Sequence, residues 1–130
     1  MLLFIKSRIL SFSHAFSGLW HVIIAENNAW IHAIATLCAV SLAFWLKITA
    51  VEWALLILTI SAVWAAECLN TAIEAIVDLS SPEYHPLAKI SKDTSAAAVL
   101  VTAITSIIIG LIILGPPLLD VLVQNLALSN

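Results

Sequence analysis

Acidic and amide side chains recur on one face of a predicted helix, and these residues have the clearest capacity for chemistry. They follow one another at intervals of three or four: Glu67, Asn70, Glu74 and Asp78. At about 100° per residue, all four lie within a stripe roughly 80° wide. The preceding segment, residues 51–66, is apolar, and its only charged residue is Glu52. Because charge is costly in a membrane, acidic residues at the end of such a segment are usually functional.

Carboxylates at a membrane surface can bind divalent cations or accept a proton from a hydroxyl group. Mg²⁺ takes one or two carboxylates together with phosphate oxygens, and a nearby lysine can neutralise a transferring phosphoryl group. Lys89, Lys92 and Asp93 follow the stripe along the chain. A carboxylate close to a lipid hydroxyl could also act as its general base. These residue types therefore suit a metal–nucleotide complex beside a membrane-borne acceptor.

Several familiar kinds of site are missing from the sequence. It contains no Walker loop, kinase glycine-rich loop or GxGxxG motif, and it has three glycines in all. Any nucleotide site must therefore be of an unusual kind. The net charge of −3 and the lack of a basic stripe argue against nucleic acid as a partner. Cys38 and Cys68 lie far apart in apolar segments, and we interpret both as packing residues.

Composition identifies the chain as an all-α integral membrane protein. Hydrophobic residues make up 62% of it, charged residues only 10%, and the mean hydropathy is +1.10. Globular domains are roughly half apolar and a quarter charged. A chain of 130 residues forms one domain, with little mass outside the membrane. A large binding site would then need neighbouring subunits, so we expect an oligomer.

Three apolar runs are long enough to cross roughly 30 Å of hydrocarbon. The predicted segments are a surface helix and turn at 1–28, membrane spans at 29–46, 51–78 and 93–115, a cytosolic loop at 79–92, and an external tail at 116–130. The second helix has about 28 residues, or roughly 42 Å, so its end projects into the cytosol. We expect the third helix to end at Gly115, because Pro116 and Pro117 follow.

Lysines and arginines predict how the chain is oriented. Lys6 and Arg8 precede the first span, and Lys89 and Lys92 lie between the second and third, whereas Lys47 alone lies in the other connection. This bias predicts a cytoplasmic N-terminus and an external C-terminus. Apolar residues recur every three or four positions in the first 25, so we expect an amphipathic helix in the cytoplasmic interface.

Two sequence motifs resemble a known family. Residues 67–78 read ECLNTAIEAIVD, and residues 81–93 read SPEYHPLAKISKD. With AAAVL at 96–100, they closely resemble the small prokaryotic diacylglycerol kinase and undecaprenol kinase family, over about residues 10–114. The resemblance implies a homotrimer in the bacterial inner membrane, with active sites between subunits at the cytoplasmic interface. It also implies an enzyme that uses Mg²⁺ and transfers the γ-phosphate of ATP to a lipid alcohol.

The resemblance further implies a role for each matching residue. Glu67 looks like the general base, and Glu26 and Glu74 resemble the metal-binding pair. Asn70 would position a phosphate or the lipid headgroup. Lys92 and Asp93 would hold the nucleotide, with Glu83 and His85 near its adenosine end. Asp78 is interpreted as a support for the loop and the site geometry.

Simpler interpretations remain for some of these residues. Glu26 could be a helix-start carboxylate favoured by the helix dipole, and His85 could cap the turn before Pro86. The other histidines are interpreted as interface or packing residues: His14, His21 and His32.

Some residues also bear on which lipid is the acceptor. The HPLAK segment at 85–89 resembles the undecaprenol kinase branch, as do four residues upstream: Glu26, Asn28, Ile31 and His32. We therefore favour undecaprenol, with diacylglycerol as the alternative. A non-catalytic trimeric scaffold is a third interpretation, although an inactive relative should have lost a motif residue and none is lost. A transport pathway would need polar residues along the spans, and segments 31–44 and 51–60 are largely apolar.

Overall fold

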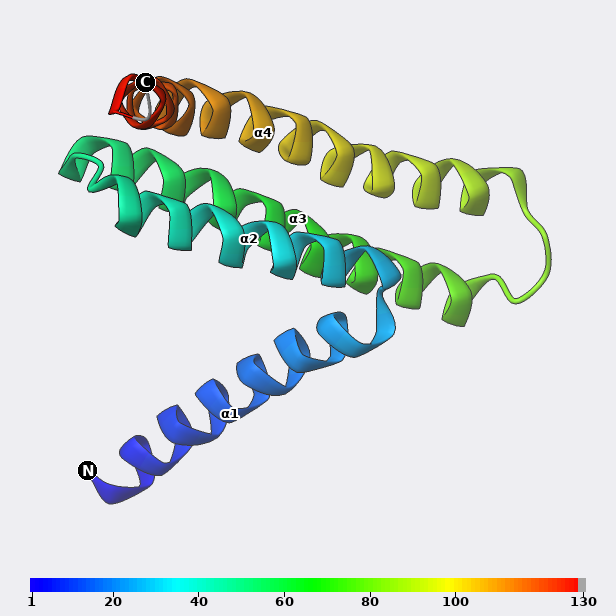
Figure 1. The fold of residues 1–130 in the computed structure, drawn as a ribbon. Helices are drawn as coiled ribbons and strands as arrows, with labels where there is room; N and C mark the ends of the chain where they lie inside the picture. The colour runs from blue at the N-terminus through cyan, green and yellow to red at the C-terminus, as the bar shows by residue number, and fades with distance from the viewer. Residues whose placement is uncertain (129–130) are drawn as a thin grey trace.

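The computed structural model describes residues 1–128, apart from the side chains of residues 2, 3 and 27, and this part of the chain folds into helices joined by short connections (Figure 1). The helices are α1 (Leu2–Ala25), α2 (Asn27–Leu46), α3 (Ala50–Ser80) and α4 (Pro86–Leu128). Three of them, α2, α3 and α4, are long and apolar enough to cross a membrane. The structure thus confirms the predicted all-α membrane fold.

Helix α1 diverges from the other three helices (Figure 1). The chain changes direction at Glu26, whose extended backbone (φ −97°, ψ 120°) interrupts the helix. Large apolar side chains of α1 are exposed, including Phe12, Phe16 and Trp20, whereas Val22 near its end is buried. An apolar helix surface of this kind suits a membrane interface.

Local sequence signals explain the tight turn between α2 and α3. Lys47 adopts a left-handed backbone conformation (φ 54°), and the Ile48 N–H donates a hydrogen bond to the Ala43 carbonyl. Thr49 and Glu52 then form a capping box in which each side chain contacts the backbone of the other residue. These contacts satisfy backbone groups at both helix ends and make α2 and α3 antiparallel neighbours.

The buried core is small and lies near the α2–α3 turn. Its buried members come from α2, α3 and α4: Ala43, Leu56, Ile113 and Leu114. Helices α3 and α4 share the most extensive packing. Further along the bundle, the Trp64 Nε1 donates a hydrogen bond of 3.3 Å to the Thr36 Oγ1, which joins α3 to α2. Most other large apolar side chains face outwards, as expected of a chain surrounded by lipid.

The start of α4 differs from the sequence prediction. Residues 86–92 are helical, so the predicted loop at 79–92 shrinks to residues 81–85 and α3 extends to Ser80. Proline is favoured in the first turn of a helix, where its missing N–H would have no partner. Pro86 takes this position, and the His85 Nδ1 accepts a hydrogen bond from the Leu87 N–H. Lys92 and Asp93 therefore lie on a helix.

The prediction that the third long helix ends at Gly115 was wrong. Helix α4 continues through Pro116 and Pro117 to Leu128. Its last turns, red in Figure 1, are seen end-on, while the preceding part runs across the view. Two missing N–H groups remove backbone hydrogen bonds and bend the helix, but proline's fixed φ is itself helical and allows it to continue. Residues 129–130 of the predicted tail lie outside the described residues.

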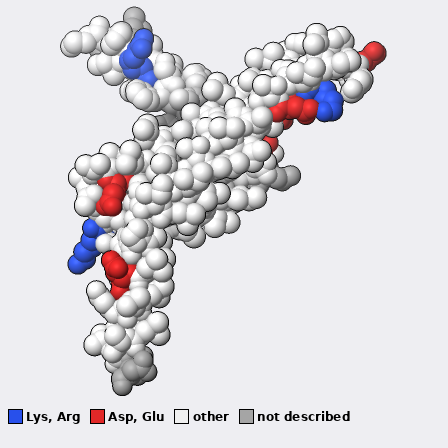
Figure 2. Space-filling model, turned by 90° about the horizontal axis from the view of Figure 1, so that it is seen from above, with Lys and Arg blue, Asp and Glu red and all other residues white. Residues whose placement is uncertain are grey.

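Charged side chains on one face of the molecule lie mainly away from its middle. Figure 2 shows blue and red atoms in separate groups around the periphery of this face, while its middle is largely white. A charge-free middle matches the hydrocarbon region that three spanning helices would occupy.

Candidate active site

A polar cavity of about 300 Å³ lies between α2, α3 and α4. Six polar side chains line it: Glu26, Asn28, His32, Glu67, Asn70 and Glu74. Three of the four residues of the predicted stripe thus face one space, together with the acidic residue from the α1–α2 break. Asp78, the fourth, is exposed beyond the cavity.

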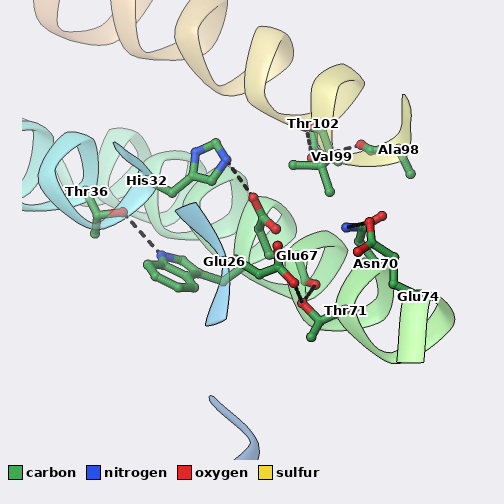
Figure 3. A network of polar contacts seen from close by, with 11 residues as sticks. Glu26, His32, Thr36, Glu67, Asn70, Thr71, Glu74, Ala98, Val99 and Thr102 are labelled. Atoms are coloured by element: carbon green, nitrogen blue, oxygen red, sulfur yellow. Dashed lines mark hydrogen bonds and ion pairs between the residues drawn. The ribbon is translucent and has the colours of Figure 1, made fainter. Parts of the chain in front are cut away.

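Glu67 is the most deeply buried polar residue of this site. Its Oε1 lies 3.0 Å from the Nε2 of His32, which reaches across from α2 (Figure 3). Among the described residues, however, this oxygen has no hydrogen bond of good geometry. A buried carboxylate is costly unless it is paired, and His32 is the group available to pair with it. An incompletely satisfied oxygen in such a place is free to accept a proton from a ligand's hydroxyl.

Glu26 is held against α3 by a neighbouring threonine. The Thr71 Oγ1 donates to the Glu26 Oε1 at 3.2 Å and also lies 3.0 Å from the Glu67 carbonyl oxygen. Glu26 occupies the N-cap position of α2, yet its side chain makes no capping hydrogen bond. Its carboxylate is therefore directed at the cavity wall of α3 and does not serve the start of its own helix.

The stripe on α3 is internally connected. The Asn70 Nδ2 donates a hydrogen bond of 3.1 Å to the Glu74 Oε1, one helical turn further on. Figure 3 shows Asn70 and Glu74 together on α3, beyond Glu67. Asn70 is buried and Glu74 half-buried, so this end of the cavity is polar and partly open.

The donor set of the cavity fits one class of metal. Within the described residues, no group of three or more His, Cys, Asp or Glu side chains is close enough to hold an ion by itself. Glu26 and Glu74 nevertheless offer hard oxygen ligands in one cavity. Mg²⁺ typically binds one or two carboxylates and completes its shell with water and substrate phosphates. The residues therefore fit Mg²⁺ that arrives with a nucleotide better than an ion held by protein alone.

Two predicted nucleotide ligands form ion pairs outside the polar cavity. Lys92 forms an ion pair with Asp78, which joins the start of α4 to the end of α3. Asp93 forms an ion pair with Lys89, one turn earlier on α4. Neither Lys92 nor Asp93 lines the cavity of a single chain.

The remaining two predicted ligands lie in the connection between α3 and α4. Glu83 is exposed, and its carbonyl oxygen accepts a hydrogen bond from the Ser81 Oγ. His85 is exposed as well, and its ring nitrogen caps α4. The capping interpretation of His85 therefore describes the contact that the structure contains.

Sequence analysis missed three side chains of the site: His32, Thr71 and Ser95. His32 was interpreted as a packing residue, yet it contacts Glu67. Ser95 on α4 reaches Asn70 on α3. One signal was present, since His32 lies four residues after Asn28 and so shares its helix face. Which residue it meets on another helix depends on helix rotation, which a single periodic pattern does not specify.

A second, apolar cavity of about 540 Å³ continues from the first. The two share three lining residues: Ile31, His32 and Ala103. Beyond them, aliphatic side chains and small residues line the apolar cavity as far as Gly115 and Leu118 on α4. The polar cavity thus opens into a long hydrophobic groove between the three helices.

Comparisons with known proteins show which sequences this chain resembles. The sequence model of a family described as prokaryotic diacylglycerol kinase matches residues 13–114. An undecaprenol kinase of Bacillus subtilis is 43% identical over 108 residues, which are 83% of this chain and 88% of the relative. A diacylglycerol kinase of Synechocystis is 40% identical over 116 residues, 88% of this chain and 66% of that relative. The Escherichia coli K12 diacylglycerol kinase is 41% identical over 93 residues, covering 66% and 76% respectively.

Proposed function

The chain belongs to the prokaryotic diacylglycerol kinase family and is a lipid kinase, and from this premise we propose that it transfers the γ-phosphate of ATP to the hydroxyl of undecaprenol. The observation that carries the proposal is the position of Glu67. Its carboxylate is buried where a polar cavity meets an apolar groove. A membrane lipid with one polar end and a long apolar chain would place its hydroxyl at this junction.

In the proposed reaction, Glu67 acts as the general base. It accepts the proton of the lipid hydroxyl as that oxygen attacks the γ-phosphorus of ATP. A new oxygen–phosphorus bond forms, the bond to the β-phosphate oxygen breaks, and ADP leaves. His32 lies 3.0 Å from the Glu67 carboxylate and keeps it directed at the junction. Positioning and charge stabilisation account for most of the catalysis of phosphoryl transfer.

The remaining polar residues would bind the phosphates. Glu26 and Glu74 are the proposed ligands of Mg²⁺, and Asn70 would contact a phosphate oxygen. Mg²⁺, when bound, neutralises the charge on the triphosphate. Lys92 and Asp93, with Glu83 and His85, are the proposed contacts to the rest of the nucleotide.

We also propose that the enzyme is a homotrimer in the bacterial inner membrane, with its N-terminus and its active site on the cytoplasmic side. Lys92 and Asp93 lie outside the cavity of their own chain, which supports sites completed by a neighbouring subunit. The exposed apolar side chains of α1 support its placement along the membrane surface.

We favour undecaprenol over diacylglycerol as the acceptor because one similar protein is an undecaprenol kinase. The undecaprenol kinase of Bacillus subtilis is 43% identical over most of both chains. Diacylglycerol remains the second candidate acceptor, since the diacylglycerol kinases of Synechocystis and Escherichia coli are 40% and 41% identical. Both lipids offer one hydroxyl and apolar chains, so the groove would accept the chemistry of either.

A parallel acceptor assay tests the proposal. Purified protein in detergent micelles is given ATP and Mg²⁺ with undecaprenol in one reaction and diacylglycerol in the other, and phosphorylated lipid is measured. We expect the larger kcat/KM with undecaprenol. Faster phosphorylation of diacylglycerol would overturn the assignment of the acceptor, and phosphorylation of neither lipid by folded protein would favour the scaffold interpretation.

A further inference from the structure

Ser95 on α4 makes a buried contact with the functional stripe of α3. Its Oγ lies 2.7 Å from the Oδ1 of Asn70, and each of the two residues is 7% exposed. Some hydroxyls on α4 bond only to backbone carbonyls of their own helix. Thr102 and Thr105 are examples. The Ser95 contact instead joins two helices at the wall of the polar cavity.

This contact selects one orientation of the Asn70 amide. An amide side chain has an accepting end and a donating end, and its neighbours decide which way it faces. The Ser95 hydroxyl donates to Oδ1, so Nδ2 faces Glu74 and donates to its Oε1 at 3.1 Å. The reverse orientation would bring the amide oxygen against the Glu74 carboxylate, where two acceptors would face each other with no hydrogen between them.

The same hydroxyl is connected to the start of α4. The Ser95 Oγ also lies 2.9 Å from the carbonyl oxygen of Lys92, one turn earlier. A hydroxyl carries one hydrogen, so the Lys92 carbonyl and the Asn70 amide share it or compete for it. The orientation of Asn70 is therefore coupled to the backbone of the turn that carries Lys92.

We propose that Ser95 is a positioning residue, which fixes the Asn70 amide and through it the Glu74 carboxylate for binding of a magnesium–nucleotide complex. This inference rests on the proposed function of the cavity. Ser95 itself contacts no substrate in this scheme and acts through Asn70.

The amide orientation can be tested without any activity measurement. The chain has five asparagines, so selective ¹⁵N-asparagine labelling gives few side-chain NH₂ signals, and the Asn70 pair is identified by its loss in Asn70→Ala. We expect a dispersed pair in the wild type and in Ser95→Thr, which keeps a hydroxyl. In Ser95→Ala the chemical shifts of the Asn70 NH₂ pair should move towards those of a free amide. An unchanged Asn70 pair in Ser95→Ala would overturn the proposal.

A mutant cycle tests the consequence for binding. The probe is Mg²⁺ with a non-hydrolysable ATP analogue, titrated calorimetrically into the micellar enzyme. Loss of a buried hydrogen bond predicts a Kd about five- to tenfold higher for Ser95→Ala. The threonine variant should restore the wild-type Kd. In an Asn70→Ala background, Ser95→Ala should have no further effect, because the residue acts through Asn70.

A matched control separates positioning from general packing. Thr102→Val removes a hydroxyl from the same helix that bonds only to carbonyl oxygens of Ala98 and Val99 (Figure 3), so its Kd should match the wild type. Equal losses in Thr102→Val and Ser95→Ala, or an additive loss on top of Asn70→Ala, would overturn the proposal. If wild-type protein binds the analogue but phosphorylates no lipid, the proposed function fails while the role of Ser95 stands.

Discussion

Glu67 and His32 form a pair of side chains from different helices, placed where a reacting hydroxyl would lie. The His32 Nε2 is 3.0 Å from the Glu67 Oε1, and the carboxylate is almost completely buried. A buried carboxylate needs a partner to hold it in one orientation. In the proposed reaction, His32 positions the base and Glu67 accepts the proton.

Replacing His32 tests this division of roles. His32→Ala leaves the Glu67 carboxylate without its neighbour. A cost of about 1–3 kcal/mol for a buried polar group that loses its partner corresponds to a fall in kcat of roughly five- to 150-fold. His32→Gln keeps an N–H donor and should recover part of this loss. Steady-state kinetics with the lipid and ATP varied separately measures the effect. His14→Ala, on the exposed surface of α1, is the control.

Thr71 provides a second test at the scale of single residues. Thr71→Val keeps the side-chain shape but removes the hydrogen bond to Glu26, so Glu26 should become more mobile as a metal ligand. We expect the Mg²⁺ concentration for half-maximal activity to rise about threefold or more, as loss of one hydrogen bond predicts. Thr105→Val, whose hydroxyl bonds only to a carbonyl of its own helix, should behave as wild type. An unchanged Mg²⁺ dependence in Thr71→Val would exclude Glu26 as a ligand held by Thr71.

The sequence predicts the stripe on α3 well, because the positions of Glu67, Asn70 and Glu74 follow from helical periodicity alone. It does not predict the partners of the stripe. His32 and Ser95 reach it from other helices, and such contacts depend on how the helices are rotated and shifted against one another. A periodic pattern within one helix carries no information on that geometry.

Helices α3 and α4 are the elements that hold the site together. They share the most extensive packing in the chain, and only residues 81–85 separate them. The ion pair between Asp78 and Lys92 joins their ends next to this short connection. Because the first turns of α4 carry both Lys92 and Ser95, the start of this helix links a proposed nucleotide ligand to the stripe.

Substitutions of the two partners in the Asp78–Lys92 ion pair should have unequal effects on the KM for ATP. An exposed ion pair contributes little to stability. Asp78→Asn should therefore leave the melting temperature nearly unchanged and raise the KM for ATP only modestly. Lys92→Met should raise the KM for ATP far more, because Lys92 is a proposed contact to the nucleotide. Equal effects of the two substitutions on KM would mean that Lys92 acts only as the partner of Asp78. Asp120→Asn, near the other end of α4, is the control.

The extent of α4 is the feature of the fold that the sequence predicts least well. Consecutive prolines usually end a helix, yet α4 bends and continues to Leu128. Membrane helices tolerate such residues because neighbouring helices and local adjustments satisfy the freed backbone groups. By contrast, apolar length and loop charges suffice to predict three spanning helices, because the thickness of the bilayer sets the length.

Truncation tests whether the far end of α4 contributes to the reaction. The polar cavity extends along α4 only to Ala103, and a chain that ends after Leu119 keeps every residue that lines either cavity. We expect unchanged kcat and KM for such a chain in the micellar assay. A large fall in kcat, with the protein still folded, would show that residues 120–130 act on the site.

At the scale of the whole molecule, two features of a single chain concern its surroundings. Large apolar side chains cover its outer faces, and the proposed nucleotide residues Lys92 and Asp93 lie outside the cavity that contains Glu67. A surrounding membrane accounts for the exposed apolar side chains. A neighbouring subunit in a trimer would explain the position of Lys92 and Asp93, since it would bring its own α4 to the cavity.

Mixed oligomers test this arrangement. Glu67→Gln and Asp93→Asn should each be inactive alone as homotrimers. If one subunit supplies Glu67 and its neighbour supplies Asp93, then denaturing, mixing and reconstituting the two variants should restore part of the turnover. Native mass spectrometry of the same sample checks that trimers form. Mixed trimers without turnover would indicate that each site is built from one chain.

The role of Glu67 is tested by comparing wild-type protein with Glu67→Gln in the ATP-dependent phosphorylation of undecaprenol. Glutamine keeps the size and polarity of the side chain but cannot accept the proton, and loss of a general base reduces the rate about 10²- to 10⁴-fold. We expect this loss in kcat with unchanged binding of the nucleotide analogue and an unchanged melting temperature. A Glu67→Gln enzyme that turns over like the wild type would show that Glu67 is not the general base.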